Sequence, residues 1–181
     1  MRNFYSFIVI LSLLFTSCVA EESSKTRDYN PEQKLEELGI QLSTPSSPVA
    51  NYVNTVKTGN LVFISGKGPL KKDGNYVLGK LGENLTLEQG YEAARLTAIN
   101  LISTLKASIG DLSKVKRIVR VTGMVNATSN FTDHPKVVNG CSDLLVEVFG
   151  DNGKHTRAAV GMNSLPLNIA VEIDMVVELY D

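Results

Sequence analysis

Two stretches of the chain repeat apolar side chains with the spacing of an amphipathic helix. The first follows Thr86, which begins a capping-box pattern, and ends at Gly110. The second begins near Asp133, has Pro135 in its first turn and ends at Gly150. Each stretch has one apolar stripe, which predicts two long helices that pack on a common core.

Segments with a two-residue alternation flank these helices and predict strands. We expect a hairpin over residues 50–66 that turns at 58–60, and a strand over 115–126 between the helices. Two closing strands are expected within 155–180, and a short helix over 31–40 precedes the hairpin. This order predicts an α+β domain with one mixed sheet and two helices packed on one face.

The closing strands carry two charges, Arg157 and Glu172, among small or apolar neighbours. Alternation groups Arg157 with Ala159 and Gly161, and it places Glu172 opposite the apolar residues of the last strand. We therefore expect both charges to lie off the helix-covered face, on a surface that suits a subunit interface or a cleft. Alternation alone is also compatible with ordinary solvated strand charges.

The start of the 181-residue chain has the pattern of an export signal. Arg2 precedes an apolar run over residues 4–15, which is too short to span a bilayer and is followed by a polar segment. Cleavage after Ala20 is one interpretation. The other is lipidation of Cys18 as the first residue of a bacterial lipoprotein.

These features predict three parts: an export signal over 1–20, a flexible tether over 21–32 and a single domain over 33–181. The expected location is the bacterial cell envelope, or otherwise secretion. Contact with the membrane is expected only through a lipid on Cys18.

Charge and cysteine content exclude several classes of partner. The chain has 18 Lys and Arg against 19 Asp and Glu, so it has no basic excess that would hold nucleic acid. Cys141 is the one cysteine beyond the N-terminal segment, and His134 and His155 are far apart in the sequence. Neither an intramolecular disulfide nor a metal site is expected.

Several segments resemble the YjgF/RidA family, also called endoribonuclease L-PSP, and within it the endoribonuclease L-PSP/chorismate mutase-like domain branch. The closing pattern is an arginine, small or apolar positions, Leu165-Pro166 and then Val171-Glu172-Ile173. Upstream, "PVANYV", "GNLVFISGKGPL" and "VNGCSDLLVEVFG" match in order, so that the resemblance covers residues 33–180. It implies a chorismate-mutase-like fold of the Bacillus type, a homotrimeric barrel with three clefts between subunits, and no cofactor.

The resemblance also implies an activity, the hydrolysis of reactive 2-imino acids and enamines such as 2-aminoacrylate to 2-oxo acids and ammonia. Arg157 would grip the carboxylate of this ligand with two hydrogen bonds, which lysine cannot copy. Glu172 would hold and activate the hydrolytic water. Tyr52 and Ser65 would line the pocket and Asn139 would shape its wall, although a packing role is compatible with each of these three.

Ala159 stands where the family often has a cysteine, two residues after the arginine. A thiol that helps to position water or product is therefore missing. Two other functions stay open. One is a non-catalytic trimer that binds small carboxylates, and the other is a ribonuclease, which would need His134 and His155 to meet across a phosphodiester.

Overall fold

The computed structural model describes residues 29–48 and 50–181, and Pro31–Asp181 form one compact unit. The export signal, the Cys18 lipidation site and residues 21–28 of the tether lie outside the described residues, so these predictions stay predictions. Within the described ranges, no helix is long and apolar enough to cross a membrane.

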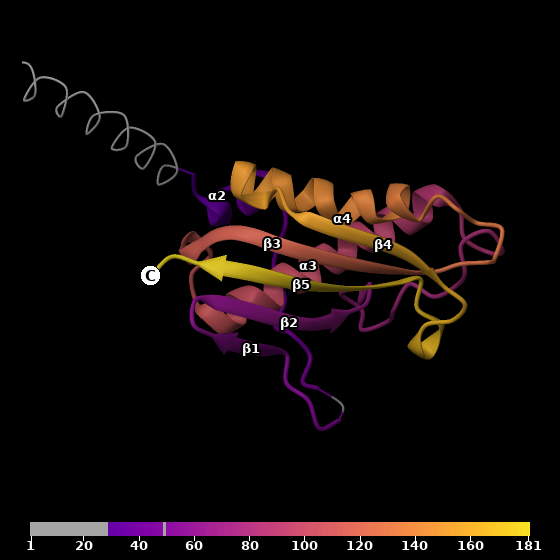
Figure 1. The fold of residues 1–181 in the computed structure, drawn as a ribbon, viewed down its shortest axis with the longest axis horizontal. Helices are drawn as coiled ribbons and strands as arrows, with labels where there is room; N and C mark the ends of the chain where they lie inside the picture. Colours follow the sequence, from indigo (N-terminus) through magenta and orange to yellow (C-terminus); the bar gives the residue numbers. More distant parts are fainter. Residues whose placement is uncertain (1–28, 49) are drawn as a thin grey trace, which may run out of the picture. The chain divides into compact units, whose positions relative to one another are not determined.

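Five strands form one mixed sheet in the order β1-β2-β5-β3-β4 (Figure 1). The strands are β1 (Thr55–Thr58), β2 (Leu61–Lys67), β3 (Val115–Asn126), β4 (Thr156–Met162) and β5 (Val171–Leu179). All pairs are antiparallel except β3 and β4, which run parallel and are joined through a helix. This crossover puts β4 at an edge of the sheet.

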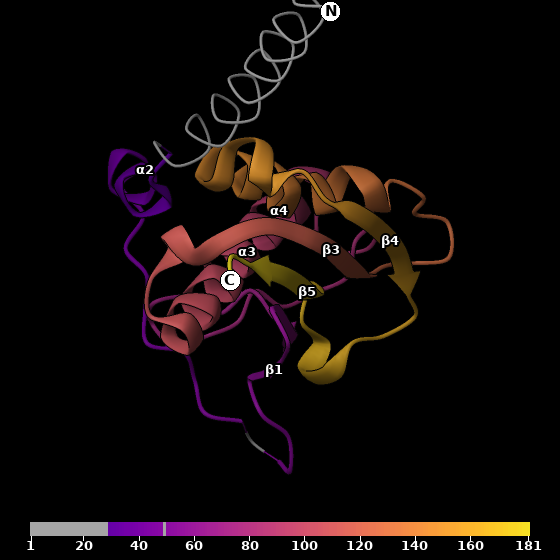
Figure 2. The same cartoon turned by 60° about the vertical axis from the view of Figure 1, so that its left-hand side comes forward.

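Two long helices, α3 (Leu87–Ile109) and α4 (His134–Phe149), pack on one face of the sheet, as predicted (Figures 1 and 2). The predicted capping box starts α3. Gln89 N donates to Thr86 Oγ1 at 3.2 Å, and Thr86 N donates to Gln89 Oε1 at 2.9 Å. Gly110 and Gly150 end the two helices, also as predicted.

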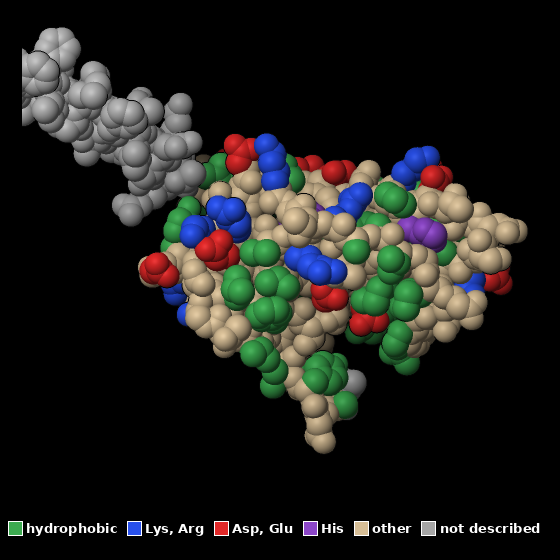
Figure 3. Space-filling view, in the orientation of Figure 1, with side chains coloured by type: hydrophobic (Ala, Val, Ile, Leu, Met, Phe, Trp, Pro, Cys, Tyr) green, Lys and Arg blue, Asp and Glu red, His purple; other side chains and the backbone are tan. Residues whose placement is uncertain are grey.

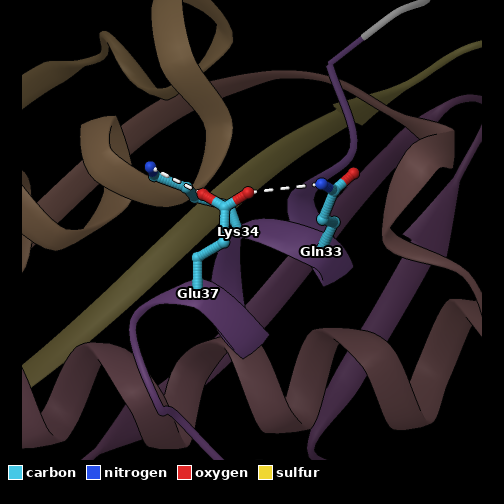
Figure 4. Close-up of polar contacts among 3 residues, drawn as sticks. All are labelled: Gln33, Lys34 and Glu37. Atoms are coloured by element: carbon cyan, nitrogen blue, oxygen red, sulfur yellow. Dashed lines mark hydrogen bonds and ion pairs between the residues drawn. The ribbon is translucent and has the colours of Figure 1, made fainter.

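The short helix α2 (Pro31–Glu37) contacts α4 and the turn Leu112–Lys114. The Glu37 carboxylate accepts hydrogen bonds from Gln33 and Lys34 on the same helix (Figure 4). These exposed contacts support a helix of only seven residues.

Strand register shows that the predicted face of Arg157 is wrong. Arg157 pairs with Val121, and Val121 pairs with Met175. Val121 and Met175 are fully buried in the core under the helices. Paired residues share a face of the sheet, so Arg157 lies on the helix-covered side, at its edge.

Glu172 lies on the opposite, open face, as expected. It pairs with Met124, which in turn pairs with Val160. Neither neighbour is in the buried core. Arg157 and Glu172 of one chain are therefore on opposite faces, with β3 between their strands.

Close packing of α4 explains why small residues line the helix side of β4. A β-carbon added at Gly161 would run into the His134 ring, and one added at Gly123 on β3 would run into Val138. Ala159, between Arg157 and Gly161 on this side, pairs with Gly123. The larger apolar residues of β4 point to the open face instead.

The hairpin begins later than predicted. Strand β1 starts at Thr55, so Tyr52 lies in a non-strand segment before it and is 49% exposed. Between β2 and α3, Leu70 and Tyr76 form an isolated antiparallel bridge.

The open face of the sheet carries large exposed hydrophobic side chains. Figure 3 shows such side chains gathered over the strands on the face opposite α3. Those on strands β1, β2 and β4 are Val56, Phe63, Val160 and Met162. A patch of this kind is typical of a surface that another protein chain covers.

Candidate active site

Arg157 is held by two neutral side chains of α4. Its Nη1 donates to Asn139 Oδ1 at 2.8 Å and to Ser142 Oγ at 3.0 Å. Asn139 and Ser142 lie three residues apart, on one side of the helix. The structure thus brings the expected arginine and the expected asparagine together.

These contacts occupy both hydrogens of Nη1 and leave one edge of the guanidinium open. A guanidinium has five N–H donors in a planar fork, and the edge formed by Nε and Nη2 can grip a carboxylate with two parallel bonds. Among the described residues, no carboxylate forms an ion pair with Arg157. The residue is exposed, and among the described residues the hydrogen-bond partners of its guanidinium are those of Nη1.

His155 continues the contacts behind Arg157. Its Nε2 lies 3.0 Å from Ser142 Oγ, and its Nδ1 lies 2.6 Å from the Gly153 carbonyl oxygen. Burial is the main cause that lowers the pKa of His155; the Gly153 hydrogen bond opposes this shift and the Arg157 charge adds to it. Neutral imidazole is therefore the favoured form near pH 7.

Glu172 lies half-buried on the open face, above β2. A β-carbon at Gly66 would collide with the Glu172 carboxylate, so the glycine provides the space that this carboxylate occupies. Burial, and to a lesser degree the charge of Asp174, raises the pKa of Glu172 above its usual range. A carboxylate with a raised pKa can exchange protons closer to neutral pH.

Ser65 and Lys67 fix the segment that carries Tyr52. Ser65 Oγ donates to the Val53 carbonyl oxygen at 2.7 Å, and Lys67 Nζ donates to Asn54 Oδ1. The Ser65 hydroxyl hydrogen is thus used within the chain, which favours a positioning role over direct ligand contact. Ser65 bonds to the Tyr52 segment, and its neighbour Gly66 lies against Glu172. Glu172 and the Tyr52 segment therefore lie at the same part of the sheet.

The predicted site residues therefore form two groups. Arg157 and Asn139 lie at the α4–β4 edge, whereas Glu172, Ser65 and the Tyr52 segment surround the end of β2. Opposite faces of the sheet and the intervening strand β3 separate the groups within one chain.

Neither cysteine chemistry nor a histidine pair completes the arginine group. Cys141 is fully buried in the core, and burial raises the pKa of its thiol to about 12. His134 lies over Gly161, whereas His155 contacts Ser142. His134 and Ser142 are eight residues apart on α4, so the histidines are separated by about 12 Å along the helix.

Ser142, His155 and Gly66 were not among the residues predicted from sequence for this site. Two of them had a readable signal. Ser142 follows Asn139 by one helical turn, and His155 precedes Arg157 by two strand positions. Within the described residues, no group of three or more His, Cys, Asp or Glu could hold a metal ion.

Comparison with known proteins assigns the family. Residues 32–179 match the family described as "YjgF/chorismate mutase-like, putative endoribonuclease". Protein TCP17 of Trypanosoma cruzi is 42% identical over 146 residues, which cover 80% of this chain and 91% of TCP17.

Solved structures agree with this assignment. Atu1372 from Agrobacterium tumefaciens, a protein of unknown function, is 39% identical with a TM-score of 0.78, over 87% of this chain and 96% of that one. A putative endoribonuclease from Shewanella oneidensis MR-1 is 34% identical with a TM-score of 0.80, over 83% and 99%. The fold, the matched residues and these relatives show that the chain belongs to the YjgF/RidA family, in its endoribonuclease L-PSP/chorismate mutase-like group.

Proposed function

We propose that the protein is a cofactor-independent hydrolase that converts 2-imino acids and their enamine tautomers to 2-oxo acids and ammonia. The observation that carries this proposal is the state of Arg157. Two neutral partners hold its Nη1, and its Nε/Nη2 edge is left without a described carboxylate partner. An arginine fixed in this way is prepared to bind a small carboxylate from solution.

The proposed site lies between subunits of a homotrimer. Arg157 and Glu172 of one chain cannot face the same ligand, because they lie on opposite faces of the sheet. A second copy that packs its open face near the α4–β4 edge of the first would bring its Glu172 toward Arg157. Such packing would also cover exposed hydrophobic side chains such as Phe63 and Val160.

The reaction needs only these groups and water. The substrate carboxylate binds the open edge of Arg157, which fixes the imine carbon beside a water held by Glu172. Glu172 accepts a proton from this water as its oxygen bonds to the imine carbon, and it passes this proton to the imine nitrogen, which gives a neutral carbinolamine. Glu172 then accepts the hydroxyl proton of the carbinolamine and delivers it to the nitrogen as the C–N bond breaks and the carbonyl forms, so that ammonia leaves and Glu172 is again a carboxylate.

Ala159 affects which residue can position the hydrolytic water in this site. It lies on the same side of β4 as Arg157. Because the residue is alanine, no thiol stands at the position where the family often has one. Cys141 cannot substitute, because it is buried in the core on α4. Positioning of the water therefore depends on Glu172.

The test is ammonia release from freshly generated 2-aminoacrylate. Wild-type protein should accelerate release over buffer, and Arg157→Ala and Glu172→Gln should each abolish most of this acceleration. A wild type that binds 2-oxo acids but releases no extra ammonia would instead indicate the non-catalytic carboxylate-binding trimer. Full activity of Arg157→Ala would refute the assigned site.

The ribonuclease implied by the names of some relatives is not favoured by this geometry. An acid and a base that act on one phosphodiester must both reach the same phosphate. His134 lies over Gly161 of β4, whereas His155 contacts Ser142, which is about 12 Å from His134 along α4. We therefore do not assign this activity to the described site.

A further inference from the structure

Ser142 and His155 lie behind Arg157 and have no part in the reaction described above. We propose that they are positioning residues for Arg157: His155, acting through Ser142, fixes which edge of the guanidinium meets the ligand carboxylate. This inference rests on the carboxylate-binding role proposed for Arg157.

The direction of each hydrogen bond follows from the atoms involved. The Gly153 carbonyl can only accept, so the Nδ1 of His155 carries the hydrogen of that 2.6 Å contact. In neutral imidazole Nε2 is then an acceptor, and the Ser142 hydroxyl donates to it at 3.0 Å. The Ser142 oxygen keeps its lone pairs for Arg157 Nη1.

The chain of bonds from Gly153 to Arg157 therefore has one consistent polarity. Asn139 Oδ1 accepts the second hydrogen of Nη1, so two acceptors on α4 fix the plane of the guanidinium. The backbone at Gly153 anchors the other end, and that glycine is buried against Leu145 of the same helix. Arg157 is thus oriented by a rigid element before any ligand binds.

The neutrality of this chain matters for affinity. A carboxylate in place of Asn139 or Ser142 would also orient Arg157, but it would neutralise the charge of Arg157 and compete with the ligand. Amide, hydroxyl and imidazole acceptors hold the side chain and leave its charge available. This explains how Arg157 can be held in place although no described carboxylate forms an ion pair with it.

Two histidine variants separate the two contacts of the ring. His155→Asn keeps a donor near the Nδ1 position for Gly153 but does not reach Ser142. His155→Gln places an amide oxygen near the Nε2 position and can still accept from Ser142. If His155 acts through Ser142, the glutamine variant should keep ligand affinity and the asparagine variant should lose it.

The experiment measures pyruvate binding by calorimetry, with pyruvate as the 2-oxo acid probe. Ser142→Ala and His155→Asn should each weaken binding about five- to tenfold, the effect of one lost hydrogen bond, whereas His155→Gln should stay within about twofold of wild type. Thermal unfolding of each variant, measured in parallel, checks that the protein is folded. Wild-type affinity in both Ser142→Ala and His155→Asn would overturn the proposal and leave only a role in the turn after α4.

A double-mutant cycle shows whether the effect passes through Arg157. In an Arg157→Lys background, Ser142→Ala should cost little further affinity, because the group that it positions is already gone. An undiminished effect in that background would also overturn the proposal. If Arg157→Lys itself binds pyruvate like wild type, the proposed function fails instead, so the two failures can be told apart.

Discussion

Replacement of Arg157 by lysine keeps the positive charge and removes the planar fork. In the structure, Nη1 uses both hydrogens on Asn139 and Ser142, while the Nε/Nη2 edge remains for a ligand. A lysine ammonium has three donors on one nitrogen and cannot hold two protein acceptors and both oxygens of a carboxylate. We therefore expect Arg157→Lys to be nearly as damaging as Arg157→Ala.

The expected loss follows from the two ligand bonds of the open edge. Charge-assisted bonds contribute about 1.5–3 kcal/mol each, and because two parallel bonds are not independent, the pair should contribute about 2–4 kcal/mol. This corresponds to a loss of affinity of roughly 30- to 1000-fold.

Calorimetric titration with pyruvate measures this loss. Arg95→Lys is the matched control, since Arg95 forms a surface ion pair with Glu147 between α3 and α4, and this change should leave affinity unaltered. Binding of pyruvate by Arg157→Lys within about threefold of wild type would refute the two-bond grip.

Three further predictions concern groups with shifted pKa values. The value of kcat/KM for ammonia release should rise with pH through a pKa above the usual glutamate range, because burial raises the pKa of Glu172. Glu172→Gln should lose this rise and most turnover but keep its affinity for pyruvate. An unchanged pH profile in Glu172→Gln would argue against Glu172 as the proton acceptor. The Cys141 thiol, with its pKa raised to about 12, should not react with a disulfide reagent at pH 8 until the protein unfolds, so rapid labelling of the native protein would contradict its packing. Since the folded state lowers the pKa of His155, the unfolded state binds the proton more readily, and the free energy of unfolding should fall as pH drops below about 6.5. Denaturant titrations should show a smaller fall for His155→Gln than for wild type. Equal falls in the two proteins would contradict the pKa shift.

Local sequence signals were sufficient for most of the fold. The capping box at Thr86 and the glycines after both long helices set their ends through short-range geometry, and the structure keeps these boundaries. The expected strand over 115–126 also has the bounds observed for β3. These features depend on neighbouring residues alone, so the sequence contains them in readable form.

The face of β4 could not be predicted in the same way. Ala158, Val160 and Met162 are together more apolar than Arg157, Ala159 and Gly161, so alternation favoured the wrong side as the exposed one. The actual face is set by parallel pairing with β3 and by the close approach of α4, which admits only small side chains near Gly161. Both causes are long-range.

This error also concealed the arrangement of the site. Alternation predicts both charges on one face of the sheet, turned toward an interface or a cleft. The observed register instead places them on opposite faces of one chain, and it turns Arg157 toward Asn139 and Ser142 on α4. Contacts between a helix and a strand edge depend on how far apart the two elements lie, which residue spacing does not specify.

The central claim is that Arg157 of one subunit and Glu172 of another form each site. Arg157→Ala and Glu172→Gln trimers should each be nearly inactive, because every site lacks one partner. Refolding or co-expressing the two variants in equal amounts gives random trimers in which about a quarter of the sites hold both residues, counting one Arg157–Glu172 pair at each of three equivalent clefts. We predict recovery of about a quarter of wild-type ammonia release in the mixture, whereas no recovery at any mixing ratio would contradict a site shared between subunits.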